Sequence, residues 1–143
     1  MFEIQAIDHV VLRVTDLDRM LGFYVDVLGC TLEKEKEKIG LYQLRAGSSL
    51  IDLVTVEGEL GRAGGRGPGP EGRNLDHFCL RVEPFDAEAI TVWLAKCGAE
   101  PGQVESRYGA EGRGPSIYVV DPEGNVVELK GPPWEPKTAR DRD

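Results

Sequence analysis

The chain contains two histidines, and both occupy the same position in a repeated segment. His9 begins the segment HVVLRV and His77 begins HFCLRV, so the shared pattern is H-x-x-L-R-V. Each half of the chain then has a carboxylate inside an apolar segment, Asp52 in LIDLV and Glu128 in VVEL. Imidazole nitrogens and carboxylate oxygens are suitable ligands for Zn, Fe, Mn, Ni or Co. The repeat therefore predicts one divalent metal ion per site, held between two similar halves by these four residues.

The period of a β-strand supports this ligand set, because alternate side chains point to opposite faces. In both repeats the Leu and Val positions share one face, which we expect to lie under a helix, and the His and Arg positions share the other. Asp52 and Glu128 also project away from the helix-covered face. A lone histidine on an apolar strand is more often a core residue, but an unpaired charge there is costly. The coincidence of four such residues favours a metal site, in which the short Asp52 could reach the ion through a water molecule.

The first half has the pattern of a β-α-β-β unit. Thr15 or Asp16 can cap the start of its helix, and Gly29 suits the end, where a left-handed backbone is needed. There is room for an additional strand near 32–37. The expected elements are a strand at 7–14, a helix at 17–28 with apolar residues at three-to-four spacing, and a hairpin of strands at 41–46 and 49–56.

The second half repeats this order. The apolar face of its helix contains Ile90, Trp93 and Leu94, and Gly98 suits the helix end. Asp121-Pro-Glu-Gly124 is a strong turn signal, and there is room for an additional strand near 103–107. The expected elements are a strand at 75–82, a helix at 87–96 and a hairpin of strands at 116–120 and 125–130.

Length and composition indicate one α+β domain. The 143 residues are enough to bury a core. A net charge of −8 argues against nucleic-acid or anionic-membrane binding. The three cysteines lack the spacing of a disulfide framework or a metal site. Without a signal-peptide pattern or an apolar run of about 20 residues, the protein is expected to be soluble and cytoplasmic.

The two halves are interpreted as two modules joined by a linker and followed by a tail. Module 1 is expected at about 5–57, a Gly-rich linker at about 58–73, module 2 at about 74–131 and a tail at 132–143, which frays after Trp134. The linker contains Arg62, Arg66 and Arg73. It is interpreted as a flexible connection, with a mobile lid that meets an anionic substrate as the alternative.

The repeated H-x-x-L-R-V strand, the segment FYVDVLG at 23–29 and the segment SIYVVDPEGNVVEL at 116–129 together resemble the vicinal oxygen chelate superfamily. This superfamily of glyoxalases, bleomycin-resistance proteins and dioxygenases also includes methylmalonyl-CoA epimerase and fosfomycin-resistance enzymes. The resemblance covers roughly residues 5 to 131, and its most specific motif is D-P-x-G-N-x-x-E-L.

The resemblance implies tandem βαβββ modules that form a cupped mixed β-sheet, usually in a homodimer. It places His9, His77 and Glu128 on the family's metal positions. Asp52 stands where glyoxalase I has Glu and epimerases have Gln. In many members the facing modules come from different chains, so a dimer could share sites across its interface.

A glyoxalase-like lyase or isomerase is the reaction that the available residues favour. A metal would hold two adjacent oxygens of a small anionic substrate and stabilise an enediolate, while Glu128 or Asp52 moves the proton. Arg13 and Arg81 share the face of the ligands and could hold a carboxylate or phosphonate. Ser116 and Tyr118 are expected to face the same side and orient the substrate.

Three other functions remain open. A fosfomycin-resistance-like, epoxide-opening enzyme is supported by Ser116 and Tyr118, but Val11 stands where those enzymes have Thr. Ring-cleaving dioxygenases use further histidines for proton transfer, and both histidines here are already committed. A non-catalytic protein that sequesters a drug or metabolite generally needs no metal ligands, so the His/His/Glu combination argues against it.

Overall fold

The computed structural model describes residues 1–135, and the chain divides after Asn74 into a first unit and a second unit. Each unit contains one four-stranded mixed sheet, and the element order of each is βαβββ, as predicted. Most of the predicted tail, 136–143, lies outside the described residues. No helix among the described residues is long and apolar enough to cross a membrane.

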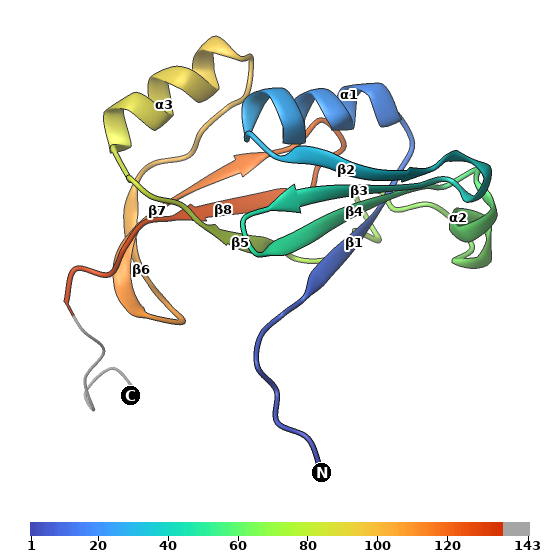
Figure 1. Cartoon of the computed structure of the whole chain (residues 1–143). Coiled ribbons are helices and arrows are strands. Elements are labelled where there is room, and N and C mark those ends of the chain that lie inside the picture. The colour runs from blue at the N-terminus through green and yellow to red at the C-terminus, as the bar shows by residue number, and fades with distance from the viewer. Residues whose placement is uncertain (136–143) are drawn as a thin grey trace. The chain divides into compact units, whose positions relative to one another are not determined.

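In the first unit the sheet order is β1-β4-β3-β2 (Figure 1), with β1 parallel to β4 and the other pairs antiparallel. The predicted hairpin and the additional strand near 32–37 are both present. The elements are β1 (His9–Val14), α1 (Leu17–Leu21), a π-helical turn (Gly22–Val27), β2 (Thr31–Lys36), a 3-10 turn (Glu37–Ile39), β3 (Leu41–Ala46), β4 (Ser49–Thr55) and α2 (Glu59–Ala63).

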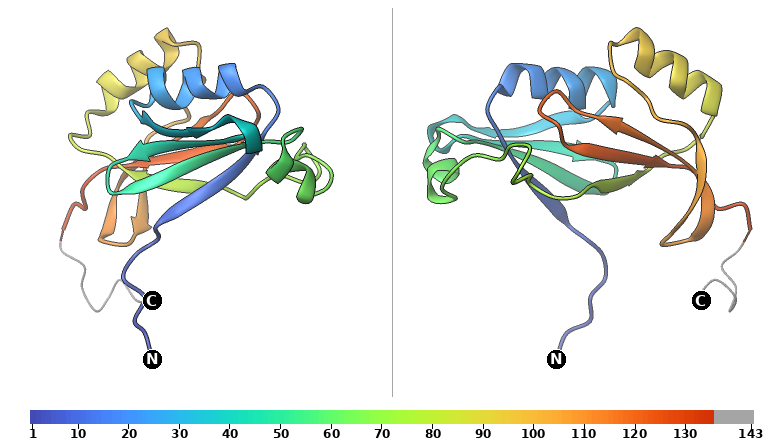
Figure 2. Two further views of the ribbon diagram at one scale, coloured as in Figure 1. Left: turned by 45° about the vertical axis from the view of Figure 1, so that its right-hand side comes forward. Right: turned by 180° about the vertical axis from the view of Figure 1, so that it is seen from behind.

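The second unit has the same arrangement, with sheet order β5-β8-β7-β6 and β5 parallel to β8 (Figure 2). Its first strand begins later than the predicted residue 75, because pairing with β8 starts at Phe78 opposite Val127. His77 therefore lies immediately before the strand. The elements are β5 (Phe78–Arg81), α3 (Ala87–Lys96), β6 (Glu105–Gly109), β7 (Gly112–Val120) and β8 (Val126–Lys130).

The predicted strand faces are confirmed by the register. Val11 pairs with Asp52 across β1 and β4, and Cys79 pairs with Glu128 across β5 and β8. The opposite faces form the cores, which are completely buried at Leu12, Leu44 and Leu53 in the first unit and at Ile117, Val119 and Val127 in the second. Asp52 and Glu128 therefore lie on the face opposite these core residues.

The first helix departs from the predicted regular α-helix. Helix α1 begins after Asp16, whose side chain accepts from the Arg19 amide, and a π-helical turn replaces its second half. The wider turn brings both Phe23 and Tyr24 into the core, with their rings edge to face at 5.0 Å. Helix α3 keeps its predicted bounds, but Trp93 is 46% exposed and only Leu94 is fully buried.

The Gly-rich segment after β4 contains local structure and is hydrogen-bonded to β1. It contains helix α2, and the guanidinium of Arg13 donates hydrogen bonds to the carbonyls of Gly61, Gly65 and Arg66. Asn74 closes the segment by accepting from the Arg13 amide at 3.1 Å and donating to the Arg13 carbonyl at 3.0 Å. Arg13 of β1 thus contacts the segment predicted as a flexible connection at several points.

The turn before β8 is held by the predicted acidic residue. Asp121 Oδ1 accepts from the amides of Glu123 at 2.8 Å and Asn125 at 2.9 Å, and Oδ2 accepts from the Asn125 side chain at 2.8 Å. Gly124 supplies the positive φ of 89° that the turn requires. This network fixes the register in which β8 leaves the turn.

Candidate metal centre

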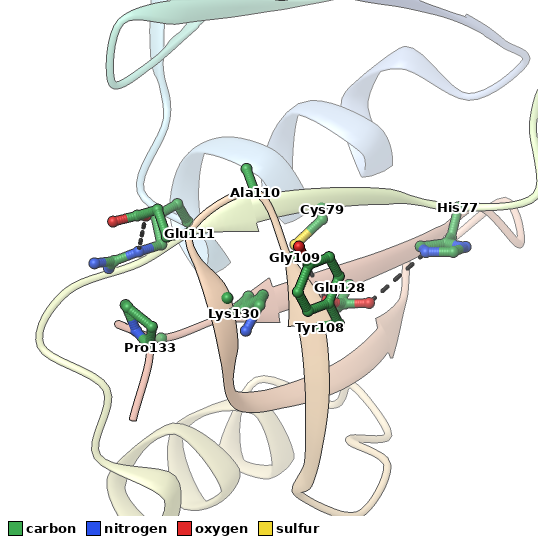
Figure 3. A pocket seen from close by; sticks show the side chains of 12 residues that line it. His77, Cys79, Tyr108, Gly109, Ala110, Glu111, Glu128, Lys130 and Pro133 are labelled. Carbon is green, nitrogen blue, oxygen red and sulfur yellow. Dashed lines mark hydrogen bonds and ion pairs between the residues drawn. The ribbon is translucent and has the colours of Figure 1, made fainter. Parts of the chain in front are cut away.

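Glu128 and His77 form the best-defined pair of predicted ligands. Glu128 comes from the middle of β8 and is only 5% exposed, whereas His77 precedes β5 and keeps much of its ring open. His77 Nε2 lies 3.7 Å from Glu128 Oε1 (Figure 3). A buried carboxylate that faces an accessible imidazole nitrogen is a donor pair that a divalent cation can join.

Aspartates that precede both histidines orient the imidazole rings. His77 Nδ1 lies 2.6 Å from Asp76 Oδ2, and His9 Nδ1 lies 2.7 Å from Asp8 Oδ1. A carboxylate on one ring nitrogen fixes the tautomer and leaves Nε2 as the electron-pair donor for a metal. The sequence already contained this signal, since the full repeat is D-H-x-x-L-R-V, but it was not recognised.

The first unit provides the second predicted pair, His9 and Asp52. The hydrogen bond that His9 donates to Asp8, together with the negative charges of Asp52 and Asp8, raises the pKa of His9 against an opposing effect of burial. Asp52 is buried, and its Oδ2 accepts from Gln43 Nε2 at 3.2 Å. Its Oδ1 is buried without a hydrogen-bond partner, so it retains a lone pair for a further ligand.

These donors fit a divalent cation as two separate pairs. An orphaned carboxylate oxygen in the first unit and a buried carboxylate beside an open imidazole in the second are both arrangements that a cation would satisfy. Among residues 1–135, no three His, Cys, Asp or Glu side chains gather closely enough to make a complete site. Two of the four predicted ligands, His9 and Asp52, belong to the first unit, and the other two, His77 and Glu128, belong to the second.

Cys79 and Tyr118 lie on either side of Glu128 in the sheet. Cys79 Sγ lies 3.3 Å from Glu128 Oε2, and burial, followed by this hydrogen bond and the charge of Glu128, raises the pKa of the thiol to about 12. Burial, followed by the charge of Glu128, also raises the pKa of Tyr118. Both groups consequently remain protonated donors beside the carboxylate at neutral pH.

Arg107 is a further residue that sequence reasoning did not assign. Its guanidinium lies over the Tyr118 ring at 4.1 Å and donates to Ser116 Oγ at 2.7 Å. The Tyr118 ring in turn meets the His77 ring edge to face at 5.4 Å. Arg107 thus holds both Ser116 and Tyr118, and the period of two along β6 was the available clue.

The two arginines of the repeat have different partners. Arg13 donates to the carbonyls of the Gly-rich segment, as described above, so it supports backbone in this structure. Arg81 Nε donates to Glu111 Oε1 at 2.7 Å, and its Nη1 donates to the carbonyl of Val82 at 3.0 Å. Neither arrangement presents a free bidentate face to a ligand.

A pocket of about 270 Å³ lies within the second unit and contains the His77–Glu128 pair. Figure 3 shows Glu128 and Lys130 on β8, with Cys79 on the neighbouring strand β5 and His77 just before that strand. The β6–β7 hairpin and the segment after β8 complete the wall. The lining residues are His77, Cys79, Arg81, Tyr108, Gly109, Ala110, Glu111, Gly112, Glu128, Lys130, Gly131 and Pro133.

Residues 6–129 match the sequence model of the Glyoxalase/Bleomycin resistance protein/Dioxygenase superfamily. The chain belongs to this superfamily. The match spans both βαβββ units and ends one residue after Glu128, so it includes every predicted metal ligand. The resemblance and the fold class inferred from the repeat are confirmed by this result.

Two relatives show the degree of similarity to known proteins. Virulence protein STM3117 of Salmonella typhimurium is 31% identical over 128 residues, which are 88% of this chain and 83% of that protein. Glutathione transferase FosA of Serratia marcescens is 26% identical over 126 residues, which are 88% of this chain and 80% of FosA. The crystal structure of STM3117 matches with a TM-score of 0.75, covering 92% of this chain and 99% of that chain at 26% identity.

Proposed function

We propose that this protein is a metal-dependent lyase or isomerase that acts on a small anionic substrate with adjacent oxygens. The observation that supports the proposal most directly is the buried carboxylate of Glu128 beside His77 Nε2, whose other ring nitrogen is held by Asp76. Burying a carboxylate without a cationic partner is unfavourable. Here the available partner is an imidazole whose orientation suits metal binding.

His77 and Glu128 would hold the metal from the second unit, and His9 and Asp52 would hold it from the first. The bound ion would supply positive charge to two neighbouring substrate oxygens. Glu128 is the preferred proton-transfer base, because it lies in the pocket with the Cys79 thiol near one oxygen and His77 near the other. Asp52 is the alternative base, since one of its oxygens has no partner.

Tyr118 would orient the substrate beside Glu128, with Ser116 acting through their common neighbour Arg107. Tyr118 keeps its proton as a hydrogen-bond donor, because burial and the charge of Glu128 raise its pKa. Arg81 would contribute positive charge at the edge of the same pocket. Arg13 has a lesser part in this proposal, because its donors already meet backbone carbonyls.

Metal analysis tests the proposal directly. Protein purified without chelator should contain one divalent ion per site, and His77→Ala and His9→Ala should each lower the metal content and affinity. Wild-type metal content in both variants would reject the ligand set. Conversion of vicinal-oxygen substrates should require the metal, whereas tight binding of a ligand without conversion would favour a sequestration protein.

A complete ligand set needs both units, either from one chain or from two copies in a homodimer. We propose a homodimer, as the family resemblance implies, in the cytoplasm, where the free thiols of Cys30, Cys79 and Cys97 would stay reduced. Sedimentation should give about twice the chain mass of 15.7 kDa. A persistent monomer would contradict the dimer.

Mixing His9→Ala protein with His77→Ala protein distinguishes the two ways of completing a site. If sites are shared between copies, each heterodimer regains one site with all four ligands, so metal binding and activity return. If each site lies within one chain, every site in the mixture lacks one histidine and nothing returns. Unmixed samples of each variant provide the control.

A second candidate is a group-transfer enzyme that opens an epoxide. The 26% identical relative is named a glutathione transferase, and Ser116 and Tyr118 pair with Lys130 and Glu128 across β7 and β8. Val11 argues against this candidate, because fosfomycin-resistance enzymes have Thr at that position. Assaying thiol consumption with fosfomycin beside an isomerase panel separates this candidate from the first.

A further inference from the structure

Lys130 is the least expected residue of the second unit. It ends β8, is only 6% exposed, and its Nζ is buried without a hydrogen-bond partner. Its side chain contributes to the wall of the pocket that contains Glu128. A buried ammonium normally requires a paired anion or several acceptors. Lys130 has neither among the described residues.

The first unit shows that the fold does not need a lysine at this position. Arg13 pairs with Val54 across β1 and β4, and Arg81 pairs with Lys130 across β5 and β8. Val54 is therefore the counterpart of Lys130, and it has the same 6% exposure. A valine satisfies this buried position in the first unit. Function, rather than folding, best explains the charge in the other unit.

The surrounding backbone leaves space for the lysine. A side chain at Gly109 would approach Lys130 Cε to 2.5 Å, and one at Gly114 would approach Nζ to 3.1 Å. Gly114 and the segment that follows β8 cover Nζ, so contact with a ligand requires a rotation about the last bonds of the side chain. The flexible four-carbon stem of lysine permits such a rotation of the ammonium group.

Lys130 is also the uncommitted cation of the pocket. Arg81 lies in an ion pair with Glu111, at 2.7 Å, and near Glu83, at 3.6 Å. Glu128 lies two residues before Lys130 on the same face of β8, a backbone separation of about 6.6 Å. A ligand with one negative group and a reactive centre a few bonds away matches this spacing.

We propose that Lys130 is the anchor for a substrate carboxylate in this pocket. The substrate class is a short carboxylic acid that has two oxygens on neighbouring carbons. Its carboxylate would meet the Lys130 ammonium while the oxygen pair lies toward Glu128. This assignment deepens the proposed function, and it rests on that function only in placing the reacting oxygens beside Glu128.

Glycerate is a suitable probe because it combines a carboxylate with two neighbouring hydroxyls, and glyceramide is its neutral counterpart. Thermal unfolding of the full-length protein is measured against concentration of glycerate, glyceramide and inorganic phosphate, with chelator and again with added Zn²⁺. A ligand that binds the native state raises the unfolding temperature. Glycerate should stabilise the wild type, and glyceramide and phosphate should bind at least about tenfold more weakly.

Lys130→Met keeps the length of the side chain and removes its charge. It should fold as stably as the wild type or more so, because the replaced ammonium has no partner. Its affinity for glycerate should fall about ten- to a hundredfold, the usual value of a charged hydrogen bond. Lys96→Met, at an exposed position of α3, is the matched control and should keep wild-type affinity.

Several results would overturn the assignment: no stabilisation of the wild type by glycerate, equal binding of glyceramide, preferential binding of phosphate, or unchanged glycerate affinity in Lys130→Met. A large loss of stability in Lys130→Met with glycerate affinity preserved would show a structural role instead. Failure of the metal proposal has a different signature, because zinc binding would be missing while the Lys130-dependent response to glycerate in chelator persists.

Discussion

Asp52 faces Gln43 on the neighbouring strand of the first unit, whereas Glu128 faces Tyr118 at the matching place in the second. The other neighbours also differ, since Val11 stands opposite Asp52 and Cys79 stands opposite Glu128. The histidines and their preceding aspartates are the same in both units. The Asp-His pairs that both units share thus orient the candidate ligands. The differing neighbours of Asp52 and Glu128 determine the other chemistry available on each sheet face.

The repeat arginines show the same divergence. Arg13 fastens the Gly-rich segment to β1 through backbone carbonyls. Arg81 instead forms an ion pair with Glu111, which lies in the wall of the pocket. One arginine therefore stabilises a long connection, and the other belongs to a concave surface. An identical residue in an identical strand position need not have an identical role.

The largest expected contrast between the units is catalytic. Glu128→Gln should reduce turnover about 100- to 10,000-fold, because it removes the preferred base from the pocket. Asp52→Asn is the matched change in the first unit and should have the smaller effect. Turnover and metal occupancy must be measured together, since both residues are proposed ligands. Equal losses of turnover in Glu128→Gln and Asp52→Asn would contradict the preference for Glu128 as the base.

The next contrast concerns Cys79, for which the first unit has Val11. Burial and the neighbouring Glu128 raise its pKa to about 12, so only about one thiol in ten thousand is ionised at pH 8. Alkylation of Cys79 in chelator-treated protein should be at least about a hundredfold slower than that of N-acetylcysteine. Glu128→Gln should accelerate it, and unchanged kinetics would contradict the contribution of Glu128. Mass spectrometry after digestion separates Cys79 from Cys97.

Stability should distinguish Arg13 from Arg81. Arg13→Met removes hydrogen bonds to several backbone carbonyls and should lower the free energy of unfolding by about 2 to 3 kcal/mol. Arg81→Met removes a partly exposed ion pair and should cost less than about 1 kcal/mol. Urea unfolding measures both. Trypsin provides a local readout, because cleavage at Arg62 and Arg66 should become faster only in Arg13→Met.

The smallest expected effect is the titration of His9. Because Asp8 raises its pKa, the folded state binds the proton more tightly than the unfolded state does. The resulting stabilisation is complete below the unfolded pKa of about 6.5 and disappears as the pH rises through the folded pKa. Asp8→Asn should lower the His9 pKa in an NMR titration of the imidazole protons, whereas Asp26→Asn should leave it unchanged. A midpoint that does not move in Asp8→Asn would contradict the role of Asp8.

Local rules predicted the frame of each unit well. The period of two placed Asp52 and Glu128 on the correct faces, and the turn residues predicted both hairpins. The π-helical turn at Gly22–Val27 was missed because three-to-four spacing alone fits an ordinary α-helix. The hydrogen bonds between Arg13 and the Gly-rich segment could not be predicted, because Arg13 is distant from that segment in sequence.

Sequence reasoning predicted the His77–Glu128 neighbourhood but overlooked the residues that define its chemistry. Asp8 and Asp76 were visible in the repeat, whereas Arg107 needed the pairing of β6 with β7 to be placed beside Ser116. The period of two puts Lys130 on the face of Glu128, but it does not predict the burial of Lys130, because a strand-end lysine is normally solvated. Burial depends on the β6–β7 hairpin, whose approach no local pattern encodes.

The hydrogen-bonded turn at Asp121 has a consequence for how this protein can vary. Strand β8 has five residues, from Val126 to Lys130, and only alternate ones face the pocket. One residue inserted or deleted in the turn would rotate the strand by half a period and exchange Glu128 and Lys130 with Val127 and Leu129. Single substitutions can therefore change the pocket one side chain at a time. A change in turn length would instead replace both charged side chains of β8 in the pocket with apolar ones at once.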